Sequence, residues 1–346
     1  MEQREVIRTL PLEWYLDRDI YEQERTKIFA REWNCIGFEY QVTGKGDYFT
    51  EDVAGWPIFV TRGNDGVLRG FHNVCPHRAG PIVWDGEGTQ GNLVCRYHGW
   101  AFRPDGGLLS ARDFQAPVDE GACLTPVQVD VWRGMVFVNI DLTAPPLMEW
   151  LGNFPSVCEE YPMAELKFHA RTVHPLDCNW KIYADNFLEG YHVPPLHPEL
   201  NQDCDGTMYR VIVKGDRRWN IHIAPPRKKE DKFLASGVYA YFWPNFSFDV
   251  FPGGFATERW LPRGPRRTDV LFDYFFTEDN PNIEEIFRAS EVVMDEDGMV
   301  ANFVQRNYES GAYGEGFISM VHENGLVDFR QLLEEVIGDK TYRATP

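Results

Sequence analysis

The stretch from Cys75 to Trp100, CPHRAGPIVWDGEGTQGNLVCRYHGW, decides how the rest of the chain is interpreted. It contains two Cys/His pairs. Cys75 and His77 have one residue between them, and Cys95 and His98 have two. The residues that separate the pairs are rich in Gly, Pro, Asp and Asn, which favour turns. Two short loops can therefore bring two thiols and two imidazoles to one metal centre.

Two kinds of metal centre use this set of side chains. Zinc accepts two thiolates and two imidazoles, but its motifs usually group cysteine with cysteine and histidine with histidine. Here each loop supplies one of each, which fits a Rieske-type [2Fe–2S] cluster, where two histidines replace two cysteines on one iron. A single Cys-x-His pair is more often part of a buried core. Two pairs at this spacing predict a cluster held by Cys75, His77, Cys95 and His98.

A second group of metal-ligating side chains lies in NWKIYADNFLEGYHVPPLHPEL, residues 179–200. Its aromatic residues recur at three- and four-residue steps, which predicts a helix from Asn179 to Tyr191. Pro194-Pro195 is expected to stop that helix. His192 would then lie in the last turn. His197 would lie beyond the break, where it can point a second imidazole at the same spot.

Two histidines and one carboxylate form the facial triad that binds Fe(II) and leaves positions open for dioxygen. The carboxylate must come from elsewhere in the chain. The segment VVMDEDGMVANFVQRN, residues 292–307, offers Asp295, Glu296 and Asp297. These acids also suit the N-terminal cap of a helix, so the residues alone leave the choice among the three open.

CPHRAG and CRYHGW resemble the Rieske motif, and nearly the whole chain resembles the catalytic α-subunit of Rieske non-haem iron oxygenases. The resemblance implies an α+β fold. An all-β Rieske [2Fe–2S] domain is expected over residues 41–150, and a catalytic domain of helix-grip (START/Bet v1-like) type over 151–346. In the latter, an antiparallel sheet wraps around a long helix. Residues 1–40 are expected to form a helical segment that packs on the catalytic domain.

The resemblance also selects among the acids. In the family, the ligand aspartate follows a glutamate and precedes a glutamine by eight residues, a placement that Asp297 and Gln305 match. Mononuclear Fe(II) is therefore expected on His192, His197 and Asp297. Asp185 and Asn186 are catalytic candidates close to that iron.

Glu189, three residues before His192, is the remaining catalytic candidate. In the family, an acid at this place binds the first ligand histidine and a cluster histidine of the neighbouring subunit. Here that histidine would be His98 of the partner subunit. Most aromatic-ring dioxygenases have aspartate at this position, and several oxygenases of carnitine-like quaternary amines have glutamate. A ligating imidazole needs such an acceptor to fix its ring.

The activity implied is that of the terminal oxygenase of a Rieske system. Electrons would come from an NAD(P)H-dependent reductase, with or without a ferredoxin. Dioxygen would then serve to hydroxylate, cis-dihydroxylate or oxidatively demethylate a small substrate, such as an aromatic compound or a quaternary amine. The chain length favours the monooxygenase or demethylase side and a homotrimer without β-subunits. The alternative, a Rieske electron-transfer protein without oxygenase activity, leaves His192 and His197 unexplained.

Composition restricts the partners. The 346 residues carry a formal net charge of −19, which disfavours nucleic acid and anionic membranes and suits neutral or cationic small molecules. The chain has neither an apolar leader nor a long apolar run, so a cytoplasmic location is expected. Its seven cysteines are scattered and odd in number, which favours metal binding over a disulfide framework.

Three further segments carry expectations. GEGTQG, residues 86–91, matches a dinucleotide-binding pattern, but it leads into a strand-like run and is interpreted as a turn. The charged stretch 215–233, which includes His222, is expected to be a solvated loop, with a lid over the pocket as the alternative. The aromatic residues between Tyr239 and Phe248 are expected mainly in the core. An aromatic cage for a methylated ammonium group is the functional alternative.

Overall fold

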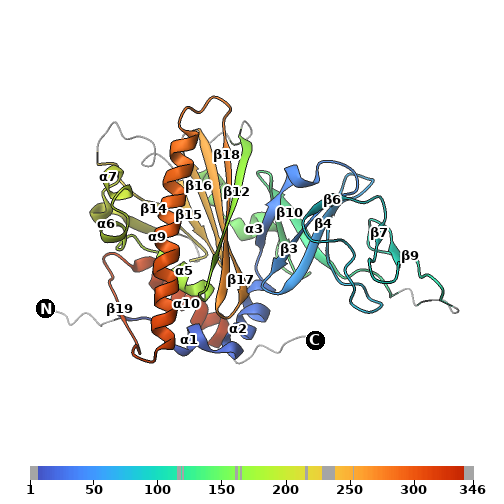
Figure 1. The fold of residues 1–346 in the computed structure, drawn as a ribbon, viewed down its shortest axis with the longest axis horizontal. Helices are drawn as coiled ribbons and strands as arrows, with labels where there is room; N and C mark the ends of the chain where they lie inside the picture. Colours follow the sequence, from blue (N-terminus) through green and yellow to red (C-terminus); the bar gives the residue numbers. More distant parts are fainter. Residues whose placement is uncertain are drawn as a thin grey trace. The chain divides into compact units, whose positions relative to one another are not determined.

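The computed structural model describes residues 7–114, 118, 121–159, 163, 166–214, 217–227, 238–251 and 253–338 (Figure 1). The chain forms two compact units. The smaller is Phe29–Gly152, and the larger combines the chain up to Ile28 with the chain from Asn153 onward. Among the described residues, no helix is both long enough and apolar enough to cross a bilayer.

The smaller unit is built on antiparallel strands, as predicted. Its larger sheet has the order β2-β11-β10-β5-β4-β3-β6, and a second sheet has the order β7-β8-β9. The turn between β4 and β5 contains Gly66 at φ +81°, a left-handed conformation that favours glycine. The strands are β2 (Asn34–Phe38), β3 (Asp47–Val53), β4 (Trp56–Arg62), β5 (Leu68–His72), β6 (Glu87–Thr89), β7 (Leu93–Val94), β8 (Ala101–Phe102), β9 (Leu108–Ser110), β10 (Pro126–Trp132) and β11 (Met135–Asn139).

Two expectations need correction, one in this unit and one in the N-terminal segment. Part of GEGTQG, interpreted as a turn, forms the strand β6, which pairs with β3. The segment before residue 40 is not wholly helical. Helices α1 (Glu13–Leu16) and α2 (Arg18–Glu24) are separate because the Asp17 side chain caps α2, and a π-helical turn, Arg25–Phe29, follows. Cys35 then lies in β2, where every residue is buried, since β2 pairs with β11.

The larger unit contains the predicted helix-grip arrangement. Its antiparallel sheet has the order β12-β18-β17-β16-β15-β14-β13. The 27-residue helix α9 (Ile283–Glu309) runs alongside this sheet (Figure 1). The strands are β12 (Lys167–Leu176), β13 (Arg210–Lys214), β14 (Trp219–Ile223), β15 (Val238–Phe242), β16 (Phe246–Phe251), β17 (Gly254–Gly264) and β18 (Arg267–Phe276).

Helix α9 presents one face to the core. Met294, Asp297, Ala301 and Gln305 recur at three- and four-residue steps and are buried. Gly298 is also buried, and a methyl group there would lie 3.0 Å from Leu176 Cδ2 of β12. The helix therefore lies close to the sheet at the residue that follows Asp297.

Short elements complete the description. They are β1 (Ile7–Arg8), which pairs with β19 (Phe317–Ile318), α3 (Leu147–Leu151), α4 (Phe154–Val157), α7 (Leu200–Asp203), α10 (Asn324–Gly338) and the 3-10 turns Glu39–Val42 and Gly206–Met208.

Helix α5 (Trp180–Phe187) is held by a buried ion pair. Asn179 caps its N-terminus by accepting from the Lys181 N–H. Lys181 Nζ lies 2.6 Å from Glu24 Oε1 of α2, and both side chains are fully buried. The Trp180 indole N–H also donates to Glu24. These contacts tie the N-terminal segment to the helix that leads to the predicted iron ligands.

The predicted extent of this helix was wrong. α5 ends at Phe187, and His192 lies in the turn before a separate short helix, α6 (Val193–Leu196). Pro194 lies in the first turn of α6, where the missing N–H costs no hydrogen bond. The two prolines therefore begin a helix, where they were expected to end one.

The charged stretch 215–233 also differs from expectation. Residues 219–223 form β14 inside the sheet, and His222 is buried. Residues 215–216 and 228–233, on which the lid interpretation depends, lie outside the described residues. The aromatic residues of β15 and β16 are largely buried, as predicted.

Candidate functional site

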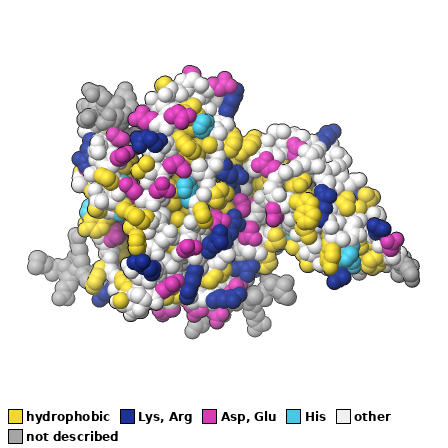
Figure 2. Space-filling view, in the orientation of Figure 1, with side chains coloured by type: hydrophobic (Ala, Val, Ile, Leu, Met, Phe, Trp, Pro, Cys, Tyr) yellow, Lys and Arg dark blue, Asp and Glu magenta, His cyan; other side chains and the backbone are white. Residues whose placement is uncertain are grey.

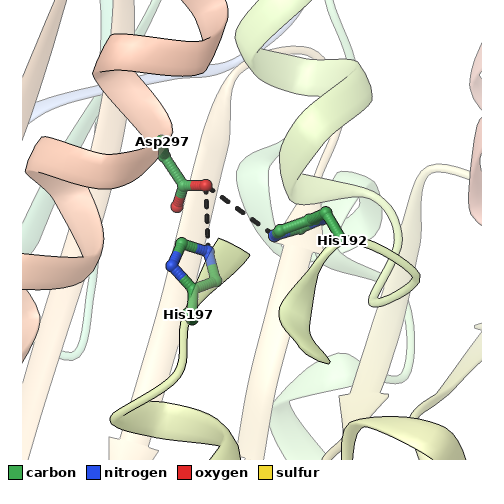
Figure 3. Close-up of side chains that lie close together, drawn as sticks. All are labelled: His192, His197 and Asp297. Carbon is green, nitrogen blue, oxygen red and sulfur yellow. Dashed lines mark ion pairs between the residues drawn. The ribbon is translucent and has the colours of Figure 1, made fainter. Parts of the chain in front are cut away.

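His192, His197 and Asp297 come together in the larger unit. Each offers one ligand atom, and the three atoms lie within 4.8 Å of one another. His192 precedes α6, His197 follows it, and Asp297 projects from α9 (Figure 3). Asp297 Oδ1 lies 3.1 Å from His197 Nε2 and 3.7 Å from His192 Nε2. The short helix α6 thus sets the separation of the two imidazoles.

Each imidazole ring is oriented by a carboxylate other than that of Asp297. His192 Nδ1 contacts Glu189 Oε1, and His197 Nδ1 lies 2.7 Å from Glu296 Oε2. Each Nε2 is thereby left to face the common centre. His197 Nε2 is buried and makes no hydrogen bond within the described part of the chain. This carboxylate–histidine arrangement is the one that orients imidazoles toward a metal, so the residues fit a mononuclear ion.

The structure distinguishes the three neighbouring acids of α9. Asp297 reaches the two histidines, Glu296 reaches His197 Nδ1, and Asp295 is exposed. They diverge because each helical residue turns the side chain by about 100°. Asn186 Nδ2 donates to Asp297 Oδ1 at 2.9 Å. Burial alone would lower the pKa of His197, but Asp297 and Glu296 together raise it.

A cavity of about 440 Å³ adjoins this group. His192, His197, Asp297, Asn186 and Glu189 line it, together with side chains from the sheet. One row of paired residues crosses the strands β14 to β18 and contributes to the lining. In order, the row is His222, Tyr239, Asp249, Ala256 and Tyr274. The sheet therefore forms one wall of the cavity.

Asp185 differs from the other predicted catalytic residues. It is not among the residues that line the cavity, and its Oδ2 accepts a hydrogen bond of 2.5 Å from the hydroxyl of Tyr15 on α1. Burial raises the pKa of Asp185 to about 7. This position favours a role in packing α1 against α5.

We expect Asp185→Asn to change the pH dependence of stability. Because the folded pKa, about 7, exceeds the ordinary 3.8, the carboxyl stabilises the fold at low pH and loses that contribution as pH rises toward 7. Relative to the variant, the wild type should lose roughly 3 kcal/mol of unfolding free energy between pH 5 and pH 8. Denaturant unfolding at both pH values measures this. Glu285→Gln, at an exposed acid, is the control, and parallel profiles for wild type and Asp185→Asn would contradict the expectation.

The smaller unit holds the Cys/His pairs in two matching turns. The N–H of Cys75 donates to Gly80 O at 2.9 Å, and the N–H of Cys95 donates to Trp100 O at 2.8 Å. Each cysteine carbonyl accepts from the N–H four residues later. Those fourth residues, Ala79 and Gly99, both have positive φ. The two loops therefore repeat one backbone conformation.

The side chains of these turns fit an iron–sulfur cluster. The rings of His77 and His98 are 4.7 Å apart between centroids, and Trp100 stacks on His77 at 4.8 Å. His77 Nδ1 is buried without a hydrogen bond in the described part of the chain. Burial raises the pKa of Cys75 to about 11, and the neighbouring Cys95 contributes. A buried thiol such as Cys75 ionises readily at neutral pH only when a cation stabilises the thiolate.

Comparison with known protein families covers both units. Residues 32–123 match the Rieske [2Fe-2S] domain, and residues 163–339 match the ring hydroxylating alpha subunit (catalytic domain). The chain belongs to the ring-hydroxylating Rieske oxygenases. Members of this family carry a [2Fe–2S] cluster and a mononuclear iron, and act as the terminal oxygenase. An electron-transfer protein without oxygenase activity is therefore disfavoured.

Individual Rieske oxygenases resemble the chain over most of its length. The carnitine monooxygenase oxygenase subunit of Escherichia coli (strain K12) is 32% identical, over 96% of this chain and 94% of its own. Choline monooxygenase of Spinacia oleracea is 31% identical, over 95% of this chain and 78% of its own. A solved quaternary ammonium Rieske monooxygenase superposes with a TM-score of 0.86 at 28% identity, over 96% of both chains.

Three cavity and ligand-supporting residues were missed by sequence reasoning. Glu296 was considered only as a rival ligand, His222 was assigned to a solvated loop, and Asp249 was not singled out. A signal existed for Asp249, which is the one charged residue in the run FSFDVF of β16. None existed for Glu296, since its partner His197 is 99 residues away in the sequence.

Proposed function

We propose that this Rieske oxygenase inserts one oxygen atom into a small N-methylated ammonium compound. The observation that carries the proposal is the excess of acidic over basic residues in the cavity lining. Of the described lining residues, eight are aspartate or glutamate and Arg288 is the one arginine or lysine. By contrast, acidic and basic side chains are interspersed on the face drawn in Figure 2. The relatives named for carnitine, choline and quaternary ammonium point to the same class.

We assign the ligands as follows. Mononuclear iron would be held by His192, His197 and Asp297, which the close approach of their ligand atoms supports. The cluster would be held by Cys75, His77, Cys95 and His98, which the matched turns and the unpartnered His77 Nδ1 support. When bound, the cluster delivers electrons and the iron activates dioxygen.

The chain's own groups would prepare the site. Glu189 and Glu296 fix the two imidazoles, and Asn186 holds the Asp297 carboxylate by its amide N–H. Aromatic side chains line the wall, among them Tyr239 and Tyr274, and aromatic rings exclude water and attract a cation to their faces. A methylated ammonium group would thus be bound without hydrogen bonds to its nitrogen.

Further assignments rest on the family resemblance. We infer that electrons come from an NAD(P)H-dependent reductase, with or without a ferredoxin, and that the protein is a cytoplasmic homotrimer. In such a trimer, Glu189 would also contact His98 of the partner subunit and connect the two metal centres.

Glu189→Gln is expected to lower the rate of oxygenation by about 10- to 100-fold, because the amide cannot match the carboxylate in holding the His192 Nδ1–H. Single-turnover oxidation of the reduced cluster, with dioxygen and substrate, measures the effect. Glu199→Gln is the control, since Glu199 lines the same cavity but is exposed. Iron content should stay unchanged in both variants. A Glu189→Gln rate within twofold of wild type would remove this residue from the electron path.

Oxygen uptake by the reconstituted system tests the function. Choline, carnitine and tetramethylammonium should be compared with benzoate and with an alkylated aromatic. We expect kcat/KM for at least one cation to exceed that for the aromatics by at least about tenfold, which is 1.4 kcal/mol. The product should be one oxygen atom heavier, or demethylated. A cis-diol from an aromatic compound would replace this proposal by ring dioxygenation.

A further inference from the structure

Asp249 is a buried acid on the cavity wall with half of its hydrogen-bonding capacity unused. It lies in the middle of β16, is 7% exposed and lines the cavity. Its Oδ2 accepts a hydrogen bond of 3.0 Å from the Ser247 hydroxyl. Its Oδ1 is buried and has no hydrogen-bond partner in the described part of the chain. A buried acceptor without a donor is unfavourable, so an acid in this state needs an explanation.

Glu258, a second acid on the same wall, differs from Asp249 in its hydrogen bonds. Glu258, on the neighbouring strand β17, lies diagonally across from Asp249 on the same face, because Ser247 pairs with Glu258. Glu258 Oε2 accepts from the Tyr183 hydroxyl at 3.0 Å and from the Trp260 indole N–H at 3.2 Å. Burial raises the pKa of Glu258 well above its ordinary value, and Asp249 adds to this. Glu258 is therefore a neutral, hydrogen-bonded part of the wall.

The described cavity lining offers Asp249 no positive partner. Arg288 lies 3.3 Å from Glu199, and both side chains are largely exposed. His222 is in the same row as Asp249, but burial lowers its pKa to about 3. Its Nε2 faces Asn220 Oδ1 and its Nδ1 faces the Tyr209 hydroxyl, which are the contacts of a neutral ring that donates from Nε2. When Asp249 is ionised, the compensating charge would therefore have to come from a ligand.

We propose that Asp249 is the counter-ion of the substrate's ammonium group. The inference rests on the proposed function and deepens it, because it names the residue that makes the cavity select a cation. On either side of Asp249, the strands place Tyr239 of β15 and Ala256 of β17. The small Ala256 leaves space beside the carboxylate, and the Tyr239 ring adds a surface that a methylated cation can contact.

The energetics agree with this assignment. Burial raises the pKa of Asp249 to about 7, so both the protonated and the ionised form are accessible near neutral pH. An ammonium ion in contact with it would favour the ionised form, since an opposite charge stabilises a buried carboxylate. A neutral ligand of equal shape gains nothing from this charge. Asp249 therefore favours a cationic ligand over a neutral ligand of the same shape, whereas the aromatic wall alone would distinguish the two only weakly.

A matched pair of ligands tests the inference. Choline and 3,3-dimethylbutanol have the same shape and differ in charge, and their affinities for the iron-loaded protein can be measured by anaerobic calorimetry. Asp249→Asn should weaken choline binding by about 10- to 100-fold and change binding of the neutral alcohol by less than about threefold. In turnover, KM for the cation should rise while kcat stays within about threefold.

Two further variants test whether the effect depends on the charge of Asp249. Glu284→Gln removes one exposed acid that does not line the cavity, and it should change neither affinity by more than about threefold. Asp249→Leu should reverse the preference, so that the neutral alcohol binds more tightly than choline. Retained binding of the alcohol shows that the cavity is intact in each variant.

The possible failures are distinguishable. If wild type binds and oxidises trimethylammonium compounds while Asp249→Asn binds choline within twofold of wild type, the inference is overturned and the proposed function stands. Equal loss of both ligands in Asp249→Asn and Asp249→Leu would also overturn it, because the residue would then only shape the cavity. If wild type binds neither choline, carnitine nor tetramethylammonium, both the inference and the proposed substrate class fail.

Discussion

His197→Ala should remove the mononuclear iron and lower oxygenation by on the order of 1,000-fold or more, because the triad then lacks one of its two imidazoles. His197 is the most buried of the proposed ligands, at 1% exposure, so water can enter to replace its ring only with local rearrangement. Iron analysis should show about one iron lost per chain. The visible spectrum of the cluster should persist, since the cluster residues belong to the other compact unit.

Glu296→Gln is the matched variant for this experiment. It leaves all three proposed ligands in place and changes only the group that faces His197 Nδ1. A loss of about 10- to 100-fold in activity or iron affinity is expected. Full iron content and normal turnover in His197→Ala would show that the ion is held elsewhere, and the assignment of the triad would then be wrong.

Cys95→Ala should abolish the visible absorption of the cluster and, with it, turnover supported by the reductase. The expected loss is again on the order of 1,000-fold or more, because electrons no longer reach the oxygenating site. Iron at the mononuclear site should remain, so that peroxide added to the variant can still support some product formation. The measurement is an absorption spectrum combined with iron and sulfide analysis.

Cys123→Ser is the control for cysteine loss. Cys123 is in the same unit but is exposed, and it belongs to neither Cys/His pair. It should retain cluster and activity. A coloured, active Cys95→Ala protein would contradict the cluster assignment, and a Cys123→Ser protein without the cluster would extend the ligand set beyond the two loops.

The parts of the fold that sequence could predict are those determined by local pattern. The two Cys/His pairs define their loops within six residues each, and the family resemblance then supplied the helix-grip fold. The choice of Asp297 among three adjacent acids needed the same resemblance, because their position alone favoured the cap of a helix, whereas the structure places them in the middle of α9. The domain boundaries near residues 40 and 150 stay predictions, as the compact units divide near 28 and 152.

The end of α5 shows why local pattern can mislead. The aromatic spacing continues to Tyr191, but the Glu189 side chain accepts from the N–H of Tyr191 and of His192, and so competes with helical hydrogen bonding. Gly190 packs against the Tyr209 ring, where a methyl group would overlap it at 2.1 Å. One local and one tertiary contact therefore lie where the helix would otherwise continue, and the periodicity of the aromatic residues does not reveal either of them.

The wall of the cavity could not be predicted for a different reason. The strand FSFDVF places the polar Ser247 and Asp249 on one face, but every residue of β16 is buried, so the pattern does not show which face borders the cavity. The role of Asp249 can be inferred only when the pairing of β16 with β15 and β17 shows which residues lie beside it. Functional residues of this kind are set by strand register, which is a property of the whole sheet.

Glu296 and Asp297 are adjacent on α9, so the position of this helix determines the position of both acids at the proposed iron site. One acid would bind the metal and its neighbour steadies His197, so a slide or twist of α9 moves both together. Gly298 lets the helix rest against Leu176 with no side chain between them. Substitutions at the contact between Gly298 and Leu176 should therefore change the activity of the iron site, although all three proposed ligands remain.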